Sequence, residues 1–473
     1  MRTTECSQTS FAFATESRQE VVARFDGGMI TTEAGGLLLH KVEQKTGILR
    51  QFAGCFRDHR DPDRTEHRVG ELVRQRVYAL ALGYEDLNDH DQLRADPLLG
   101  LLSGKADVEG KQRRREQDRG KAGAGKSTLN RLELTPADAD ETARYKKIVL
   151  DTGAVDDLLV DLYIQRQPRQ LQRIVLDLDA TDDPLHGHQE GRFFHGYYDE
   201  YCYLPLYIFI DEQLLCVRLR QSNIDASEGA REEVERIVQR LRRVWPEAEI
   251  LLRADSGFCR DEIMSWCEDN RVGYAFGLAR NSRLEKKIRK ALRKAQRQYA
   301  ETGKSARVFV EFSYRTRQSW SRRRRVVAKA EYTSKGDNPR FVVTSLEAEQ
   351  MDARSLYEDF YCARGEMENR IKEQQLGLFA DRTSTALMRS NQIRLYFSGI
   401  AYCLMQALRE LGLAGTEMAK AQCQTIRLRL LKIGARVRIT ARKLWISMAS
   451  GHPAQALFAQ VYTRLERLEP LRC

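Results

Sequence analysis

Three acidic residues carry the chemistry that this sequence suggests. Asp179 ends the segment RIVLDLD, Asp255 ends EILLRAD, and Glu368 lies within YCARGEMENRIKE. Carboxylates are the ligands that Mg²⁺ and Mn²⁺ prefer, and two such ions about 4 Å apart stabilise the attacking and leaving oxygens of a phosphodiester. We therefore predict that Asp179, Asp255 and Glu368 hold two Mg²⁺ ions, replaceable by Mn²⁺, and catalyse phosphodiester cleavage.

Other acids near Asp179 compete for the same role. Asp177 lies two residues earlier and on the same face of a predicted strand, so it is the main alternative as the first metal ligand. Asp182 and Asp183 follow the apolar alternation. We assign them to the loop after the strand and predict that they take no part in the chemistry.

The segment around Glu368 is predicted to be a helix with one polar face. Tyr361, Arg364, Glu368 and Lys372 are spaced by three, four and four residues, which aligns them along that face. Such a face suits the binding of phosphates beside a metal ion, so Tyr361, Arg364 and Lys372 are predicted to contact DNA. An exposed face of salt bridges explains the spacing equally well.

These acids need a fold that brings residues distant in the sequence together. From residue 173 the pattern predicts three strands, a helix, a strand, a helix and a further strand. This order is typical of a ribonuclease-H-like mixed sheet, in which the first and fourth strands are neighbours and set Asp179 beside Asp255. We expect an α/β protein with a ribonuclease-H-like catalytic core, a β-rich insertion and a mainly helical N-terminal domain.

Changes in these patterns divide the chain into five parts. The insertion begins with an amphipathic helix and continues with three strands, and the tail contains a helix and an alternating segment that fits a hairpin. The predicted parts are a helical DNA-binding domain (1–140), the first part of the core (141–280), the basic insertion (281–346), the second part of the core with the glutamate helix (347–410) and a C-terminal region (411–473).

Positive charge is concentrated in one stretch of the chain. Residues 280–325 hold 17 lysines and arginines against 3 acids, whereas the whole chain has a net charge of +11, so the rest is close to neutral. Basic residues interleaved with aromatic ones are typical of a nucleic-acid surface. Trp320 is a candidate for stacking on an unpaired base, with core packing as the alternative. The cations predicted to contact DNA phosphates are Arg322, Arg323, Arg324 and Arg325.

Cysteine and histidine usage indicates no transition-metal centre. The ten cysteines form no C-x-x-C pair, which predicts reduced, structural thiols. His186, His188 and His195 lack a further ligand at a usual spacing, so we interpret them as hydrogen-bonding groups of a loop beside the acids. The polar opening of the chain and its short apolar runs predict a cytoplasmic, nucleoid-associated protein that is not bound to a membrane.

The segment from Gly120 to Ser127, GKAGAGKS, matches the phosphate-loop pattern G-x-x-x-x-G-K-[ST]. A phosphate loop follows a buried strand, but the ten residues before this match, GKQRRREQDR, hold no apolar side chain. We therefore interpret it as a flexible joint, followed by a helix with Ser127 or Thr128 as the N-cap. No ATP binding is expected.

At these residues the chain resembles the DDE transposases of bacterial insertion sequences, and most closely the insertion sequence thirteen-eighty family. The likeness spans most of the chain, in the order of the family, and rests on GYEDLNDHDQLRADP, STLNRLE, LDLDATDDPLHGHQEG, RADSGF, WSRRRRVVAKAE, YCARGEMENRIKE and NQIRLYFSGIAYCLMQALR. It implies that Asp179, Asp255 and Glu368 are the catalytic residues. It also implies a β insertion between the second aspartate and the glutamate.

The family pattern Y-x-x-R-x-x-x-E-x-x-x-x-x-x-K is met by Tyr361, Arg364 and Glu368. Its lysine position holds Gln375, so Lys372, one turn earlier, is the candidate substitute.

The resemblance implies an enzyme that binds the terminal inverted repeats of its element, cleaves the strands and joins them to a target. Its partner would be double-stranded DNA, bound by a homodimer or a larger assembly. No ATP is needed, because a DNA 3′-hydroxyl attacks the target phosphate directly. Two alternatives stay open: a metal-dependent nuclease that cuts without joining, and a DNA-binding protein whose catalysis has lapsed.

Overall fold

The alternating segment before Asp179 forms strand β6 (Arg173–Ala180), which lies inside a nine-stranded mixed sheet. The order along the sheet is β11-β10-β6-β12-β13-β17-β15-β14, with β16 paired to β15. β6 runs parallel to β12, and β12 parallel to β13, so the expected pairing of the first and fourth strands is confirmed. The other strands of this sheet are β10 (Leu206–Ile210), β11 (Gln213–Arg218), β12 (Glu249–Ala254), β13 (Val272–Leu278), β14 (Ala306–Tyr314), β15 (Arg324–Thr333), β16 (Gly336–Asp337) and β17 (Arg340–Thr344).

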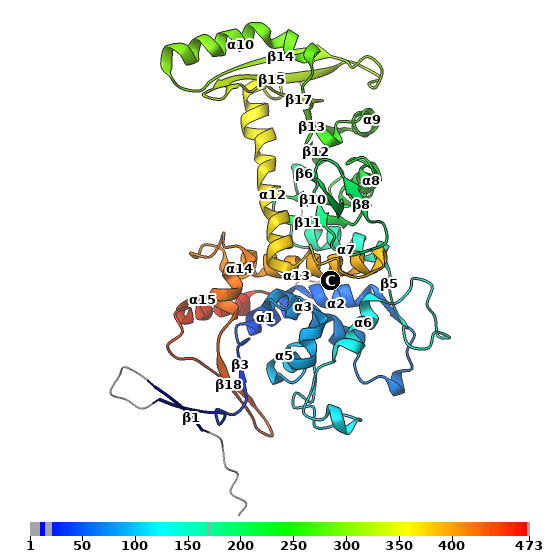
Figure 1. Ribbon diagram of the computed structural model, residues 1–473, viewed down its shortest axis with the longest axis vertical. Helices are drawn as coiled ribbons and strands as arrows, with labels where there is room; N and C mark the ends of the chain where they lie inside the picture. The colour runs from blue at the N-terminus through cyan, green and yellow to red at the C-terminus, as the bar shows by residue number, and fades with distance from the viewer. Residues whose placement is uncertain (1–9, 15–20, 168–169, 471–473) are drawn as a thin grey trace, which may run out of the picture.

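The structure is a computed structural model that describes residues 10–14, 21–167 and 170–470. Figure 1 shows an elongated molecule in which the large sheet runs from the N-terminal helices to α10 at the far end. Helices α8 (Ala230–Val244) and α9 (Asp261–Asp269) lie along one side of the sheet, and the helix that carries Glu368 lies along the other (Figure 1). Apolar residues of α8 recur at helical spacing and are buried, which fixes this helix on the sheet.

The segment predicted as an insertion continues the sheet rather than starting a new one. Strand β17 pairs with β13, and β15 and β14 follow outward, so the core strands and the segment from 306 to 344 share one hydrogen-bonded surface. The amphipathic helix expected at the start of the insertion is α10 (Ser282–Thr302), which packs on β14 and β15. The residues of its apolar stripe are Leu284, Ile288, Ala291 and Ala295, which are buried, and Leu292, which is partly buried. The opposite face of α10 is exposed.

The segment with Glu368 is helical but irregular. It runs through α11 (Ala353–Ser355), a π-helical stretch (Leu356–Tyr361), a 3₁₀ turn (Cys362–Arg364), α12 (Gly365–Lys372) and a second π-helical stretch (Glu373–Gly377). π-helical stretches rotate the faces of a helix and are frequent at functional sites. The single straight face predicted for residues 361–372 is therefore broken between Tyr361 and Arg364.

Helix α13 (Met388–Leu408) joins the N-terminal helices to the sheet. It is apolar around most of its circumference, and it packs on α3, α1, α2 and β11. A helix buried on all sides has no polar face, which is why helical periodicity alone does not reveal it. In the described part of the chain no helix is long and apolar enough to cross a membrane.

Around α13 gather elements from both ends of the chain, as Figure 1 shows. The N-terminal helices are α1 (Gly36–Thr46), α2 (Ile48–Gly54), α3 (Val69–Leu82), α4 (His90–Leu93), α5 (Pro97–Leu102), α6 (Lys126–Glu133) and α7 (Thr152–Ile164). The C-terminal elements are α14 (Cys423–Ile426), the expected hairpin β18 (Ala435–Ile439) and β19 (Leu444–Met448), and α15 (Gln455–Arg467). Short strands complete the fold: β1 (Ser10–Phe13), β2 (Val21–Arg24), β3 (Ile30–Thr31), β4 (Phe56–Asp58), β5 (Ile148–Leu150), β7 (Asp183–Pro184), β8 (Phe193–His195) and β9 (Glu200–Tyr203).

The segment that matches a phosphate loop differs from the expectation in two respects. Gly125, not Ser127 or Thr128, is the N-cap, because α6 begins at Lys126. The segment, predicted to be a flexible joint, is also held in place by the Gln75 side chain. The N–H of Ala124 donates to Gln75 Oε1 at 2.8 Å, and Gln75 Nε2 donates to the carbonyl of Ala124 at 2.7 Å. The element before it is a 3₁₀ turn, so the buried strand that a phosphate loop needs is not there in the described residues.

The eight cysteines in the described residues are free thiols, and seven of them are buried. Cys6 and Cys473 lie outside the described residues.

A buried ion pair locks β6 to β12. The guanidinium of Arg253 donates to both carboxylate oxygens of Asp177 at 2.7 Å, and a third N–H reaches the carbonyl of Phe360 at 2.8 Å. Arg253 is the register partner of Asp177, so the two charges meet only in this alignment of the strands. The pKa of the Asp177 carboxyl is raised above its usual value, because burial outweighs the lowering effect of the adjacent Arg253.

We predict that Arg253→Ala lowers the free energy of unfolding by about 3–5 kcal/mol, because it leaves the Asp177 carboxylate buried without its partner. Arg173→Ala is the matched control: Arg173 pairs with Glu249 across the same two strands, but both side chains are exposed. Its loss should cost at most about 1 kcal/mol. Urea denaturation of the two variants measures the difference, and equal costs would contradict the role given to Arg253.

Candidate active site

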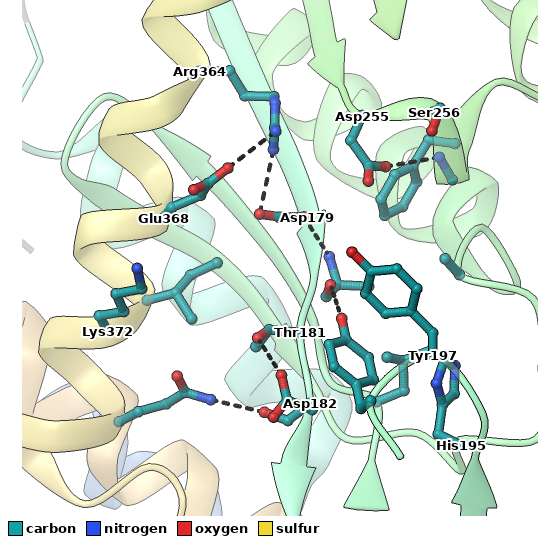
Figure 2. Close-up of a pocket in the computed structure, with 18 residues that line it drawn as sticks. Asp179, Thr181, Asp182, His195, Tyr197, Asp255, Ser256, Arg364, Glu368 and Lys372 are labelled. Atoms are coloured by element: carbon teal, nitrogen blue, oxygen red, sulfur yellow. Dashed lines mark hydrogen bonds and ion pairs between the residues drawn. The ribbon is translucent and has the colours of Figure 1, made fainter. Parts of the chain in front are cut away.

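Two strand ends and one helix bring the three predicted acids to one pocket. Asp179 lies near the end of β6, Asp255 directly follows β12, and Glu368 projects from α12. The strand register pairs Ala254 with Leu178, so Asp255 follows beside Asp179. All three line a pocket of about 630 Å³, and Figure 2 shows Glu368 facing the strand that carries Asp179.

Arg364 bridges two of the acids. Its guanidinium donates to Asp179 Oδ2 at 3.3 Å and to Glu368 Oε1 at 3.1 Å, as the dashed lines in Figure 2 indicate. The Asp255 carboxylate accepts a hydrogen bond from the backbone N–H of Gly257 at 2.8 Å. The cationic side chain of Arg364 thus lies among the carboxylates and partly neutralises them.

The electrostatics of Asp179 reflect this crowding. Burial raises the pKa of its carboxyl to about 7; Arg364 acts to lower that pKa, and the carboxylates of Asp255 and Glu368 act to raise it. A raised pKa means that the ionised form is less stable here than in water. An additional cation beside Asp179 would therefore be favoured.

The alternative first ligand, Asp177, is committed elsewhere. Its carboxylate is buried in the pair with Arg253 and does not line the pocket. Of the acids after the strand, Asp182 lies in the loop and lines the pocket, whereas Asp183 belongs to strand β7 and is buried. Burial raises the pKa of Asp183 far above its usual range.

Tyr361, Lys372 and Gln375 surround the acids on the helix side. Lys372 is exposed and lines the acidic pocket, and Gln375 donates a hydrogen bond to the carbonyl of Asp182 at 3.0 Å. Tyr361 lines a smaller neighbouring pocket together with Asp255 and Arg364. A Cβ at Gly277 on β13 would lie 2.6 Å from the Tyr361 hydroxyl, so glycine is required there for this approach.

The arginine run of the insertion is placed differently from the prediction. Arg324 is buried, and its guanidinium pairs with Asp261 and Glu268 at 2.6 Å each. Arg325 pairs with Glu311 and Arg322 with Glu268, whereas Arg323 is exposed. Arg324 in this position presents no surface to DNA, because the sheet and α9 enclose it.

Trp320 is only 3% exposed, and its ring packs edge-on against Tyr314. The stacking role predicted for it is not supported, and the alternative of core packing accounts for its position. Much of the exposed positive charge of this region lies on α10, where Lys286, Lys290, Arg293 and Arg297 are all exposed.

Sequence reasoning missed two tyrosines at the pocket. Tyr197 and Tyr198 both line it, and the ring of Tyr197 is 86% exposed. His195 also lines the pocket, with its ring 4.9 Å from that of Tyr198, but it ends strand β8, and its buried Nδ1 has no hydrogen-bond partner in the described residues. The expected role as a hydrogen-bonding group of a loop is therefore not confirmed for His195. The signal was the pair of adjacent tyrosines directly after the histidine-rich segment. An exposed aromatic ring is a surface on which a nucleobase can stack.

The donor set fits a hard divalent cation. Within the described residues no three His, Cys, Asp or Glu side chains stand close enough together to hold one metal ion. Arg364 occupies the space between two of the acids instead. The three predicted acids, which all line the pocket, are carboxylates, the donor type that suits Mg²⁺ or Mn²⁺ rather than zinc.

Comparison with known proteins identifies the family of this chain. No individually curated protein matches the chain. A family model described as Transposase DDE domain group 1 matches residues 13–470, which is nearly the whole chain. The protein therefore belongs to this group of DDE transposases, a family that acts on DNA and generally uses divalent metal ions.

Proposed function

We propose that this chain is a cut-and-paste DNA transposase of the insertion sequence thirteen-eighty family. It binds the terminal inverted repeats of its element, cleaves the DNA strands at the element ends and joins them to a target. It acts on double-stranded DNA as a homodimer or a larger assembly. We further propose nucleoid association, a ribonuclease-H-like core and the five-part division of the chain given above.

The convergence of the three acids carries this proposal. Asp179 and Asp255 follow neighbouring parallel strands, and Glu368 faces them from α12 in one pocket. The strand order β11-β10-β6-β12-β13, a three-stranded meander followed by two parallel strands, supports the ribonuclease-H-like topology. Asp179, Asp255 and Glu368 would hold two Mg²⁺ ions, and bound ions of this kind stabilise the charge on the attacking and leaving oxygens.

The cationic side chains of the pocket complete the arrangement. Arg364 and Lys372 carry positive charge on the helix side, where the phosphate of a cleaved strand would lie. Gln375 ties the loop after β6 to the helix and thereby positions Asp182. Tyr361 approaches Gly277 of β13 and lines the smaller pocket together with Asp255 and Ser256.

The catalytic assignment predicts that Asp179→Asn, Asp255→Asn and Glu368→Gln each retain binding of an element-end duplex. Each should lose Mg²⁺- or Mn²⁺-dependent nicking and joining by about 10³-fold or more, because one metal ligand is removed with little change in volume. Cleavage of a labelled duplex measures the loss. Glu366→Gln is the control, since Glu366 is exposed on the same helix and does not line the pocket.

The same assay separates the alternatives. A wild-type protein that cuts without joining would be a nuclease, and one that binds the ends but never cuts would be a lapsed DNA-binding protein. Normal cutting by the Asp179 variant would remove Asp179 from the catalytic set.

Arg364 should compete with metal for the acids. We predict that Arg364→Gln raises the affinity for Mn²⁺ by about tenfold or more in the absence of DNA, because a cation within 4 Å of two ligands is removed. Electron paramagnetic resonance titration of Mn²⁺ measures this without catalysis. Arg354→Gln removes an equal charge from a pair with Glu358 outside the pocket and should leave the affinity unchanged. Unchanged affinity in both variants, with binding abolished by Asp255→Asn, would contradict the competition.

The exposed cations of α10 should contribute sequence-independent DNA affinity. Replacing Lys286, Lys290, Arg293 and Arg297 with Gln should reduce the slope of log affinity against log salt by about 3–4, for element ends and unrelated duplexes alike. Fluorescence anisotropy at several salt concentrations gives the slope. Arg324→Gln should instead lower the melting temperature and leave the slope unchanged, because Arg324 is buried in ion pairs. Loss confined to element ends would show that α10 reads bases.

A further inference from the structure

A second basic surface lies in the N-terminal part of the molecule. Segments 60–67, 113–118, 128–131 and 144–147 enclose a groove of about 550 Å³, nearly as large as the acidic pocket. We call it the basic groove. Eight lysines and arginines line it against three carboxylates. Burial holds the pKa of the lining histidine, His67, at about 3, so that side chain is neutral.

The carboxylates of the basic groove are already neutralised. Asp61 pairs with Arg64, Glu66 with Arg113 at 2.7 Å, and Asp118 with Arg94 at 3.0 Å. Five lining cations form no ion pair with a carboxylate in the described residues, and these are Arg114, Arg115, Arg131, Arg144 and Lys147. The groove therefore carries a substantial uncompensated positive charge.

These unpaired cations repel one another. Arg131 is partly buried on α6, and burial, followed by the charges of Arg60 and Arg115, lowers the pKa of its guanidinium. Beside it, Arg144 lies over the ring of Tyr145, with 4.9 Å to the ring centroid, and that ring is 60% exposed. A site that holds like charges together without a counter-ion favours a polyanionic ligand.

The basic groove lies apart from the acidic pocket. Helix α6 lies below α13 in Figure 1, whereas β6 and β12, which lead to the acids, lie above it. No residue lines both the basic groove and the acidic pocket. A ligand in the groove would therefore be held away from the reacting bond.

We infer that the basic groove binds the phosphate backbone of duplex DNA and anchors it at a distance from the acidic pocket. This inference rests on the proposed function, which supplies the ligand class, and adds a second DNA contact to it. The groove contacts are phosphate contacts, so they increase affinity for any duplex and carry no base sequence. A single phosphate ion would fill only a small part of about 550 Å³.

The test compares two triple variants of the full chain. Arg115→Gln, Arg131→Gln and Arg144→Gln together remove three unpaired groove cations. Lys420→Gln, Arg429→Gln and Arg442→Gln together remove three exposed cations from the C-terminal region, outside the groove. Fluorescence anisotropy with an element-end duplex and an unrelated duplex gives the affinity at several salt concentrations, and thermal melting checks that each variant is folded.

We expect the groove variant to lose affinity for both duplexes and its salt slope to fall by about 2–3, whereas the control variant stays close to wild type. A groove variant with the slope of wild type would overturn the inference, and the proposed function would stand if the α10 variant still reduced binding. A wild-type protein that binds neither duplex would overturn both. Tripolyphosphate binding that only the groove variant loses, with duplex affinity unchanged, would assign the groove to a small phosphate ligand and also overturn the inference.

Hydrogen exchange of the wild-type protein gives a reading that needs no variant. A bound duplex should slow backbone exchange in 113–118 and 128–131. Unchanged exchange in both segments under saturating duplex would contradict the inference.

Discussion

The buried ion pair between Asp177 and Arg253 is the contact on which the arrangement of the acids depends. A charged pair in the interior is stable only when its geometry is satisfied, and this one is satisfied in a single register of β6 and β12. The third hydrogen bond of Arg253, to the Phe360 carbonyl, ties the helix of Glu368 to the same two strands. One side chain thereby fixes the relative position of all three elements that supply the acidic pocket.

The acidic pocket is held together against its own charge. Asp179 is buried beside two further carboxylates, which raises its pKa, and the guanidinium of Arg364 offsets part of the repulsion. The fold thus tolerates a cluster that would otherwise be destabilising, because a cation from the same helix lies within it. Arg364 has two roles in this view: it stabilises the metal-free protein, and it presents a positive charge at the place where phosphates approach.

Local sequence patterns were enough to predict the strands that carry the acids and their pairing. Strict alternation in 173–180 identified β6, and the order of elements predicted that β6 and β12 are neighbours, which placed Asp179 beside Asp255. The predictions that failed concern side chains whose contacts come from residues distant in the sequence. Arg324 was predicted to contact DNA, but it is buried by Asp261 and Glu268, which are distant in the sequence. For Trp320, core packing was the alternative to base stacking, and its burial against Tyr314 supports that alternative. Helix α13 was not predicted from periodicity, because it is buried around most of its circumference and has no distinct polar face.

Positive charge is presented in two physically different ways. On α10 it follows from helical periodicity: the apolar stripe faces the sheet and the cations face solvent, so a window of sequence is enough to find it. Four segments supply the cations of the basic groove, and its carboxylates are neutralised by ion pairs that form only when the protein folds. Because these segments are separated in the sequence, no single stretch of the chain shows the cationic surface that the folded protein has. For the same reason the groove depends on the tertiary packing of α6 and its neighbours, whereas the charge of α10 depends only on one helix.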